Sequence, residues 1–218
     1  MSNEENQLSM AHVQYPDAPG SIFGPGDEPM IALLEKSPPL GKWIDCGAGD
    51  GRYAKQILKS ADSLVAFDID PRALDKLRRD LDEELRDKLI LQTGDLNKTL
   101  PFADGHFDGA FCSSTIHQFS ERTIRSVFAE MLRIVRPGGR VLVDFFHDIE
   151  RVMSDGNLYI YPGEISYDAA VAKRIIDESF SGRNVNVLES RIVEDFETDN
   201  GVVKYKFNGN LSIVECAV

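Results

Sequence analysis

The chain has 218 residues, 42% of them hydrophobic and 28% charged, which is typical of one globular domain with a buried core. Its formal net charge of −12, from 24 basic and 36 acidic residues, argues against nucleic acid as a partner, because nucleic-acid binding needs a cationic surface. No apolar run reaches the length of a membrane span, and the polar, acidic first ten residues do not have the pattern of a signal peptide.

The three cysteines, Cys46, Cys112 and Cys216, are far apart and lie inside apolar runs. An odd number of cysteines in such positions favours reduced core thiols over a disulfide frame or a zinc site. We therefore expect a reducing compartment, the cytoplasm, and no bound metal.

Residues 1–26 are rich in glycine and proline and carry few apolar side chains. This stretch predicts either a flexible arm that folds over a site as a lid, or a disordered tail. A single domain is expected over residues 27–218. It opens with Asp27 as N-cap of a helix that runs through Lys36, with Pro29 in its first turn.

An apolar run at residues 43–46 ends in three glycines at every second position (Gly47, Gly49 and Gly51), and residues 52–60 follow with a helical pattern. In a strand, glycine loop and helix of this kind, backbone N–H groups can receive a polar or anionic ligand group at close range. A tight turn without a ligand is the alternative for this loop alone.

Residues 64–70 predict a second buried strand that ends in two acids. Asp68 lies 21 residues after Gly47, close to the interval at which an acid on the next strand accepts hydrogen bonds from ribose hydroxyls. Asp70 and Pro71 fit the N-cap and first position of a helix that carries an apolar stripe as far as Leu85. Asp68 is therefore the ligand candidate and Asp70 the structural residue.

Further strands are predicted at residues 89–93, 107–113 and 140–146. Asp95 follows the first of these and, taken alone, is a turn residue. Between the other two lies the strongest helix of the chain, capped by Ser120 and ended by a Pro-Gly-Gly turn at residues 137–139. The alternation of strand and helix indicates a parallel, doubly wound sheet.

The last third has a different pattern, with a helix at 167–180 and strands at 185–196, 202–207 and 211–218. Two segments, residues 199–201 and 208–210, have hairpin-turn composition and predict antiparallel pairing. The strand at 202–207 is expected at an edge, and the more apolar strand at 211–218 in the interior of the sheet.

From about residue 40 to the C-terminus the pattern resembles the class I S-adenosylmethionine-dependent methyltransferases, in their small-molecule branch. Five blocks in the same order carry the resemblance: IDCGAGDG (44–51), FDID (67–70), TGDL (93–96), LPFADGHFDGAFCSSTIHQF (100–119) and MLRIVRPGGRVLVDFF (131–146). The resemblance implies an α/β fold with a doubly wound, mostly parallel, seven-stranded Rossmann-like sheet and an antiparallel C-terminal hairpin. It also implies S-adenosylmethionine as cofactor and S-adenosylhomocysteine as product.

The same resemblance implies where the methionine part of the cofactor lies. Gly47, Ala48 and Gly49 would lie beneath it, Asp45 would hold its amino group through water, and Ser113 would face the methionine end and the methyl group.

For the nucleoside part, the resemblance implies that Asp68 accepts from the ribose hydroxyls and that Ile69 packs on the adenine. Asp95 would accept from the exocyclic amine of the adenine, beside the backbone N–H of Leu96.

The motifs that mark other acceptors are absent. CSST at 112–115 stands where enzymes that methylate amide or adenine nitrogens carry Asn/Asp-Pro-Pro-Tyr, and there is no Pro-Cys pair of the cytosine-carbon type. A small-molecule acceptor is therefore expected. His117 and His147 follow strand ends and are candidates for a catalytic base, although each also fits a structural or loop residue.

Three other functions remain open from the sequence. An NAD(P)-dependent oxidoreductase usually has GxGxxG and Tyr-x-x-x-Lys, which this chain lacks. A non-catalytic S-adenosylmethionine sensor or partner subunit, and an aminopropyl transferase that uses decarboxylated cofactor, would share the glycine loop.

Overall fold

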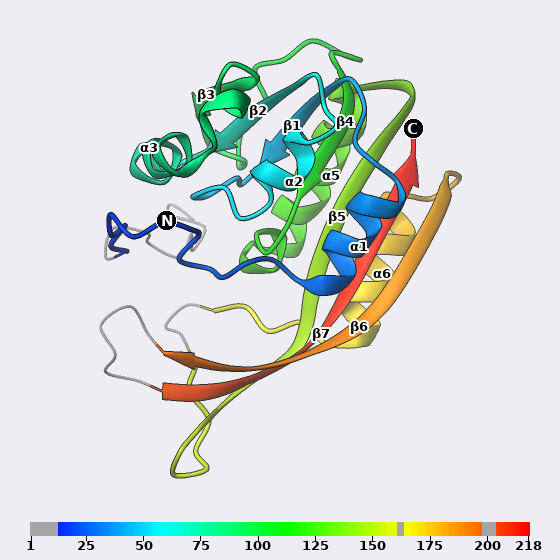
Figure 1. Ribbon diagram of the computed structural model, residues 1–218. Helices are drawn as coiled ribbons and strands as arrows, with labels where there is room; N and C mark the ends of the chain where they lie inside the picture. Colours follow the sequence, from blue (N-terminus) through cyan, green and yellow to red (C-terminus); the bar gives the residue numbers. More distant parts are fainter. Residues whose placement is uncertain (1–12, 161–163, 198–203) are drawn as a thin grey trace, which may run out of the picture.

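A computed structural model describes residues 13–160, 164–197 and 204–218. Over these residues the centre is a seven-stranded sheet with the order β3-β2-β1-β4-β5-β7-β6 (Figure 1). The strands are β1 (Lys42–Cys46), β2 (Ser63–Asp68), β3 (Leu89–Thr93), β4 (Phe107–Cys112), β5 (Val135–Met153), β6 (Asn184–Glu197) and β7 (Lys204–Ala217). Strands β1 to β5 pair in parallel, whereas β7 is antiparallel to both β5 and β6. The predicted fold class is confirmed.

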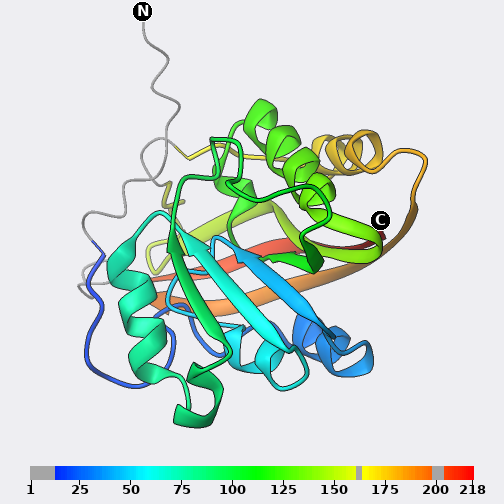
Figure 2. The ribbon, with the colours of Figure 1, turned by 90° about the horizontal axis from the view of Figure 1, so that it is seen from above.

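Helices cover both faces of the sheet (Figure 2). They are α1 (Glu28–Lys36), α2 (Ala54–Leu58), α3 (Pro71–Asp80), α4 (Glu83–Arg86), the 3₁₀ turn η2 (Ile116–Gln118), α5 (Glu121–Ile134) and α6 (Ala169–Ser179). The apolar sides of α1, α2 and α3 pack on one face, and those of α5 and α6 pack on the other. Within β2, Leu64 and Ala66 face the first group, and Val65 and Phe67 the second. This alternation explains why the parallel strands are apolar throughout. No described helix is long and apolar enough to cross a membrane.

Local signals set the helix starts as expected. The Asp70 carboxylate accepts from the Arg72 N–H at 3.0 Å, and Ser120 Oγ accepts from the Thr123 N–H at 3.3 Å. The single helix predicted from Pro71 to Leu85 is instead divided into α3 and α4. The Arg86 guanidinium donates to two backbone carbonyls at the end of α3, which a continuous helix would have bonded itself.

The segment Asn208-Gly209-Asn210, predicted as a hairpin turn, lies inside the continuous strand β7. Asn210 pairs with Arg191 of β6 and with His147 of β5. A bulge in β5 between His147 and Glu150 accommodates the irregularity, with Asp148 at a φ of 50° and accepting from Asn210 Nδ2. The described part of β7 is therefore interior, β6 is the edge strand, and the edge position expected for 202–207 was wrong. The other predicted turn, 199–201, lies outside the described residues.

Gly51→Ala is expected to destabilise the fold by about 2–4 kcal/mol. Gly51 has a φ of +87°, and a Cβ built on it would lie 2.1 Å from Cδ1 of Leu77, which is buried on α3. Urea unfolding measures the effect. Gly156→Ala is the matched control, because Gly156 has a φ of +84° and nothing within 4 Å of the added Cβ. Equal losses in the two variants would show that packing on Leu77 is not the cause.

Candidate functional site

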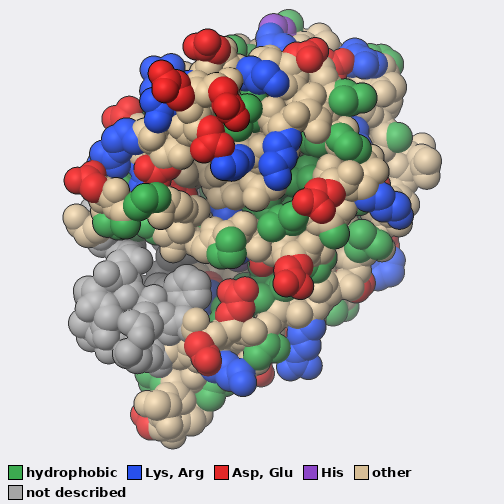
Figure 3. Space-filling view, viewed as in Figure 1, with side chains coloured by type: hydrophobic (Ala, Val, Ile, Leu, Met, Phe, Trp, Pro, Cys, Tyr) green, Lys and Arg blue, Asp and Glu red, His purple; other side chains and the backbone are tan. Residues whose placement is uncertain are grey.

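A cavity of about 1360 Å³ opens at the carboxyl ends of the parallel strands. It lies where the strand order reverses, since β1 pairs with β2 on one side and with β4 on the other. Its walls come from the glycine loop, the tips of β2 and β4, the N-terminal residues 13–16 and 22–25, and the distal halves of β5, β6 and β7. The face shown in Figure 3 has acidic, basic and apolar side chains interspersed, without a continuous basic surface.

The glycine loop is tied to the neighbouring strand by its backbone. The N–H groups of Gly47 and Ala48 donate to the Phe67 carbonyl at 2.8 and 3.2 Å. A Cβ on Gly47 would meet the Thr115 side chain at 2.6 Å, whereas one on Gly49 would have only the Phe23 ring near it, at 3.6 Å. Gly49 therefore presents bare backbone to the cavity, and Gly47 is required for packing against Thr115, between β4 and η2.

Asp68 fixes the loop to the end of β2. Its Oδ2 accepts from the Gly49 N–H and its Oδ1 from the Asp70 N–H, both at 2.8 Å. Burial raises the pKa of Asp68, although these two bonds oppose the shift. The Ile69 N–H also bonds to this carboxylate, so of its four lone-pair sites at least one remains for a hydroxyl donor. Asp68 lines the cavity in a fixed orientation.

Most of the predicted cofactor residues meet in one wall. Those that line the cavity are Asp45, Gly47, Ala48, Gly49, Asp68, Ile69, Leu96 and Ser113. Asp95 is not among the lining residues, and its Oδ1 accepts from the Asn97 N–H at 2.9 Å and from Asn97 Nδ2 at 3.1 Å. The ligand roles of these residues stay predictions.

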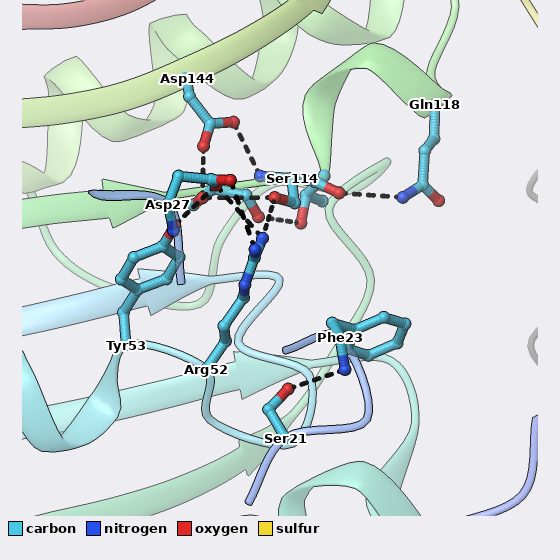
Figure 4. Close-up of polar contacts among 10 residues, drawn as sticks. Ser21, Phe23, Asp27, Arg52, Tyr53, Ser114, Gln118 and Asp144 are labelled. Carbon is cyan, nitrogen blue, oxygen red and sulfur yellow. Dashed lines mark hydrogen bonds and ion pairs between the residues drawn. The ribbon is translucent and has the colours of Figure 1, made fainter. Parts of the chain in front are cut away.

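Behind Ser113 lies Asp144, an acid that sequence reasoning missed. Its carboxylate accepts from Ser113 Oγ and, at 2.7 Å, from the Ser114 N–H (Figure 4). It is fully buried, and burial raises its pKa to about 7. Ser114 has a φ of 54°, unusual for a residue other than glycine, and the bond to Asp144 helps hold that conformation. The sequence feature that could have identified Asp144 is its position, since it is the one acid inside the apolar run 141–146.

A second polar group connects α1 with the glycine loop (Figure 4). Asp27 stands at the N-cap of α1 as predicted, but its side chain makes no capping bond. Its carboxylate instead accepts from the Tyr53 hydroxyl at 2.8 Å and lies 3.3 Å from the Arg52 guanidinium. Arg52 also donates to Ser114 Oγ at 3.0 Å, and Gln118 Nε2 donates to the Ser114 carbonyl. Sequence reasoning had assigned no role to Arg52 or Tyr53.

The two candidate histidines lie in different places. His117 lines the cavity edge-on to Phe146, with ring centroids 5.4 Å apart, and burial lowers its pKa to about 4. His147 does not line the cavity, and its ring is bonded to Ser212 Oγ at 3.1 Å and Asp148 Oδ2 at 2.8 Å. Successive residues of a strand point to opposite faces, so β5 can direct Phe146 or His147 into the cavity but not both.

The described part of the N-terminal arm, residues 13–26, packs against the glycine loop and α3. Ser21 Oγ and the Ile22 N–H donate to the Asp50 carboxylate at 2.5 and 2.7 Å, and Lys76 Nζ donates to the Ala18 carbonyl at 2.8 Å. Phe23 lines the cavity above Gly49. Residues 1–12, also assigned to the arm, lie outside the described residues, and movement of the arm as a lid stays a prediction. Among the described residues, no group of three or more His, Cys, Asp or Glu is arranged to hold a metal.

A doubly wound sheet with an antiparallel β7 between β5 and β6, and a glycine loop at its switch point, defines the class I methyltransferase fold. Residues 44–139 match a family model described as "Methyltransferase domain". This span is therefore similar to a methyltransferase domain, and the described chain has the fold of the class I S-adenosylmethionine-dependent methyltransferases, as the sequence blocks predicted.

Solved structures agree on the fold. The YcgJ protein of Bacillus subtilis superposes with a TM-score of 0.65 at 14% identity, covering 87% of this chain and 98% of that one. A SAM-dependent methyltransferase of Aquifex aeolicus gives a TM-score of 0.58 at 18% identity, covering 88% and 90%. At these identities the likeness shows the fold alone.

Among curated proteins, the demethylmenaquinone methyltransferase of Tropheryma whipplei is 28% identical over 118 residues. That alignment covers 54% of this chain and 47% of the relative. The chain spans less than half the length of the curated relatives that it matches.

Asp45→Asn is expected to stabilise the ligand-free protein more at pH 8 than at pH 5. Burial raises the pKa of Asp45 from 3.8 to about 8, so between these values the folded state keeps a proton that the unfolded chain has released. Stability then falls as pH rises, by up to about 1.4 kcal/mol per pH unit, and asparagine removes this dependence.

Urea unfolding at pH 5, 6.5 and 8 measures the difference between Asp45→Asn and the unmodified protein. Asp155→Asn is the control, because hydrogen bonds from Asn157 lower the pKa of this exposed acid and keep it ionised throughout the range. A difference for Asp45→Asn that stays constant from pH 5 to pH 8 would contradict the burial argument.

Proposed function

We propose that the protein transfers a methyl group from S-adenosylmethionine to a small-molecule acceptor. The observation that carries the proposal is one cavity lined both by the glycine loop and Asp68 and by aromatic side chains of β5 and β7, which we call the acceptor chamber. The methyltransferase domain match supports the donor end, because this class uses S-adenosylmethionine.

The residues of the chain fit the cofactor at each part. Gly49 offers backbone without a side chain, and the fixed Asp68 carboxylate keeps a lone pair for a ribose hydroxyl. Ile69 is 44% exposed and offers an apolar surface for adenine. Asp45 offers a carboxylate to the amino group. When bound, the cofactor supplies an electrophilic methyl group on a sulfonium, so the protein need only align the acceptor and exclude water.

The acceptor chamber is built from β5, β6, β7 and η2. Its aromatic and apolar part is lined by His117, Phe146, Ile192, Tyr205 and Phe207, and its charged part by Arg151, Glu164, Glu194 and Asp195. The first part suits a flat or branched apolar region of the acceptor, such as an aromatic or isoprenoid group, and the second suits a polar group on the same molecule. The name of the Tropheryma relative, a demethylmenaquinone methyltransferase, points to the same kind of acceptor.

His117 is suited to positioning rather than to proton removal. With a pKa lowered to about 4 its ring is neutral at physiological pH and is a weak base. Its Nδ1 is buried and finds no hydrogen-bond partner among the described residues. A neutral imidazole beside Phe146 can bond an acceptor hydroxyl while the ring packs on the aromatic wall.

Isothermal calorimetry is expected to show that S-adenosylmethionine and S-adenosylhomocysteine bind with micromolar dissociation constants, and to detect no binding of NAD or NADP. Asp68→Ala should weaken both by about 1–3 kcal/mol, because a buried carboxylate loses its hydroxyl partners. Asp70→Ala is the control, since Asp70 caps α3 and should affect stability more than affinity. Unchanged affinity in Asp68→Ala would contradict the ribose assignment.

Transfer itself is tested with methyl-labelled cofactor and a panel of phenols, quinols, isoprenoid quinols, amines and carboxylic acids, together with a sample without acceptor. Label is expected in an organic-soluble aromatic or isoprenoid product, and Phe207→Ala should raise the KM for that acceptor without changing cofactor affinity. Tight cofactor binding with no labelled product from any class would favour a non-catalytic sensor.

A further inference from the structure

We propose that Arg52 binds the carboxylate of the methionine part of the cofactor, so that the site selects S-adenosylmethionine over its decarboxylated form. This inference rests on the proposed function, since it assigns a residue to the same ligand. It would also exclude aminopropyl transfer, which uses the decarboxylated molecule as donor.

Three arginines line the cavity in the described chain, and their existing partners differ. Arg72 donates to Asp70 through Nε at 2.9 Å and Nη2 at 2.7 Å, and Arg151 donates to Glu164 at 2.8 Å. Arg52 meets Asp27 only at 3.3 and 3.4 Å. Charge-assisted bonds are usually 2.7–2.9 Å long, so Arg52 is the arginine least committed to a carboxylate of the protein itself.

Asp27 is held by a different partner. Its carboxylate accepts from the Tyr53 hydroxyl at 2.8 Å, and its own N–H donates to that hydroxyl at the same distance. A ligand carboxylate that draws the guanidinium away from Asp27 would therefore leave this acid bonded. The Nε of Arg52 is buried and has no partner among the described residues, so a carboxylate beside it would satisfy a donor that is otherwise unmet.

The position of Arg52 corresponds to the amino-acid end of the ligand. Its backbone follows the glycine loop directly, and its guanidinium reaches the tip of β4, where it donates to Ser114 Oγ at 3.0 Å (Figure 4). The nucleoside end is expected at Asp68 and Ile69, on β2. Arg72 lies on that side with Asp70 and is thus poorly placed for a methionine carboxylate.

The charges at this end also match. The methionine part of the cofactor carries an ammonium, a carboxylate and a sulfonium, with a net charge of +1. The facing wall has Asp27, Asp45 and Arg52; because burial raises the pKa of Asp45 to about 8, the wall reaches a net charge of −1 only when Asp45 releases its proton. Asp45 and Asp27 suit the two cationic groups, and Arg52 is the remaining group of opposite sign for the carboxylate. A planar guanidinium can bind a carboxylate with two parallel bonds, which gives both affinity and selectivity.

The test is calorimetric binding of S-adenosylmethionine and of decarboxylated S-adenosylmethionine to the full chain and to Arg52→Gln. The unmodified protein should prefer the carboxylate-bearing ligand by about 10- to 100-fold, the range expected for a lost charge-assisted hydrogen bond. Arg52→Gln should lose that preference. Because it removes a positive charge, it should bind the more cationic decarboxylated ligand equally or more tightly.

Arg72→Gln is the matched control and should change affinity for the two ligands by the same factor. Arg52→Lys keeps the charge but not the planar fork, and should retain an intermediate preference, which provides a second variant if glutamine prevents folding. Equal losses for both ligands in Arg52→Gln, or equal affinities in the unmodified protein, would overturn the inference while leaving methyl transfer intact. If the unmodified protein bound neither S-adenosylmethionine nor its decarboxylated form, the proposed function would be contradicted, and this inference with it.

Discussion

The site depends on the Asp68 carboxylate, which joins two segments that must stay together. One oxygen holds the Gly49 N–H of the glycine loop, and the other holds the Asp70 N–H at the start of α3. These bonds fix the loop at the end of β2 before any ligand is present, so the oxygens that face the cavity are already oriented. Preorganisation of this kind lowers the conformational cost of binding. The buried position also raises the pKa of the carboxyl group, although the bonds from the backbone N–H groups oppose that shift.

Local chemistry explains what the sequence could predict. Asp70 and Ser120 cap their helices because the bonds involved span two or three residues, and the buried parallel strands follow from unbroken apolar runs. The prediction from sequence was wrong where the backbone conformation depends on a strand that is distant along the chain. Asn208, Gly209 and Asn210 have turn composition, yet pairing with β5 and β6 on both sides keeps them extended. The bulge in β5 that allows this pairing is more than fifty residues away in the chain and has no local signal in β7.

In the candidate site, too, some residues could be recognised from local sequence patterns, whereas others come together only in the folded chain. The glycine loop and Asp68 were recognisable because their spacing alone has a physical meaning. The group formed by Asp27, Arg52, Ser114 and Asp144 was not, because its members come from four separate segments and meet only in the folded chain. Asp27 is instructive, since its position predicts a capping side chain while Tyr53 offers it a buried hydroxyl instead. Side chains alternate along β5, and because Phe146 points into the cavity, the neighbouring His147 points to the opposite face of the strand.

The two ends of the cavity have separate origins along the chain. The glycine loop, Asp68 and Ser113 all lie within residues 44–139, the span that the methyltransferase model matches. Of the side chains that line the second end, His117 lies within this span, whereas Phe146, Ile192, Tyr205 and Phe207 lie on later residues of β5, β6 and β7. Evolution can therefore remodel the second end without disturbing the first. Under the proposed function, relatives that share the matched span can therefore differ in their acceptors, because most of the acceptor end lies outside that span.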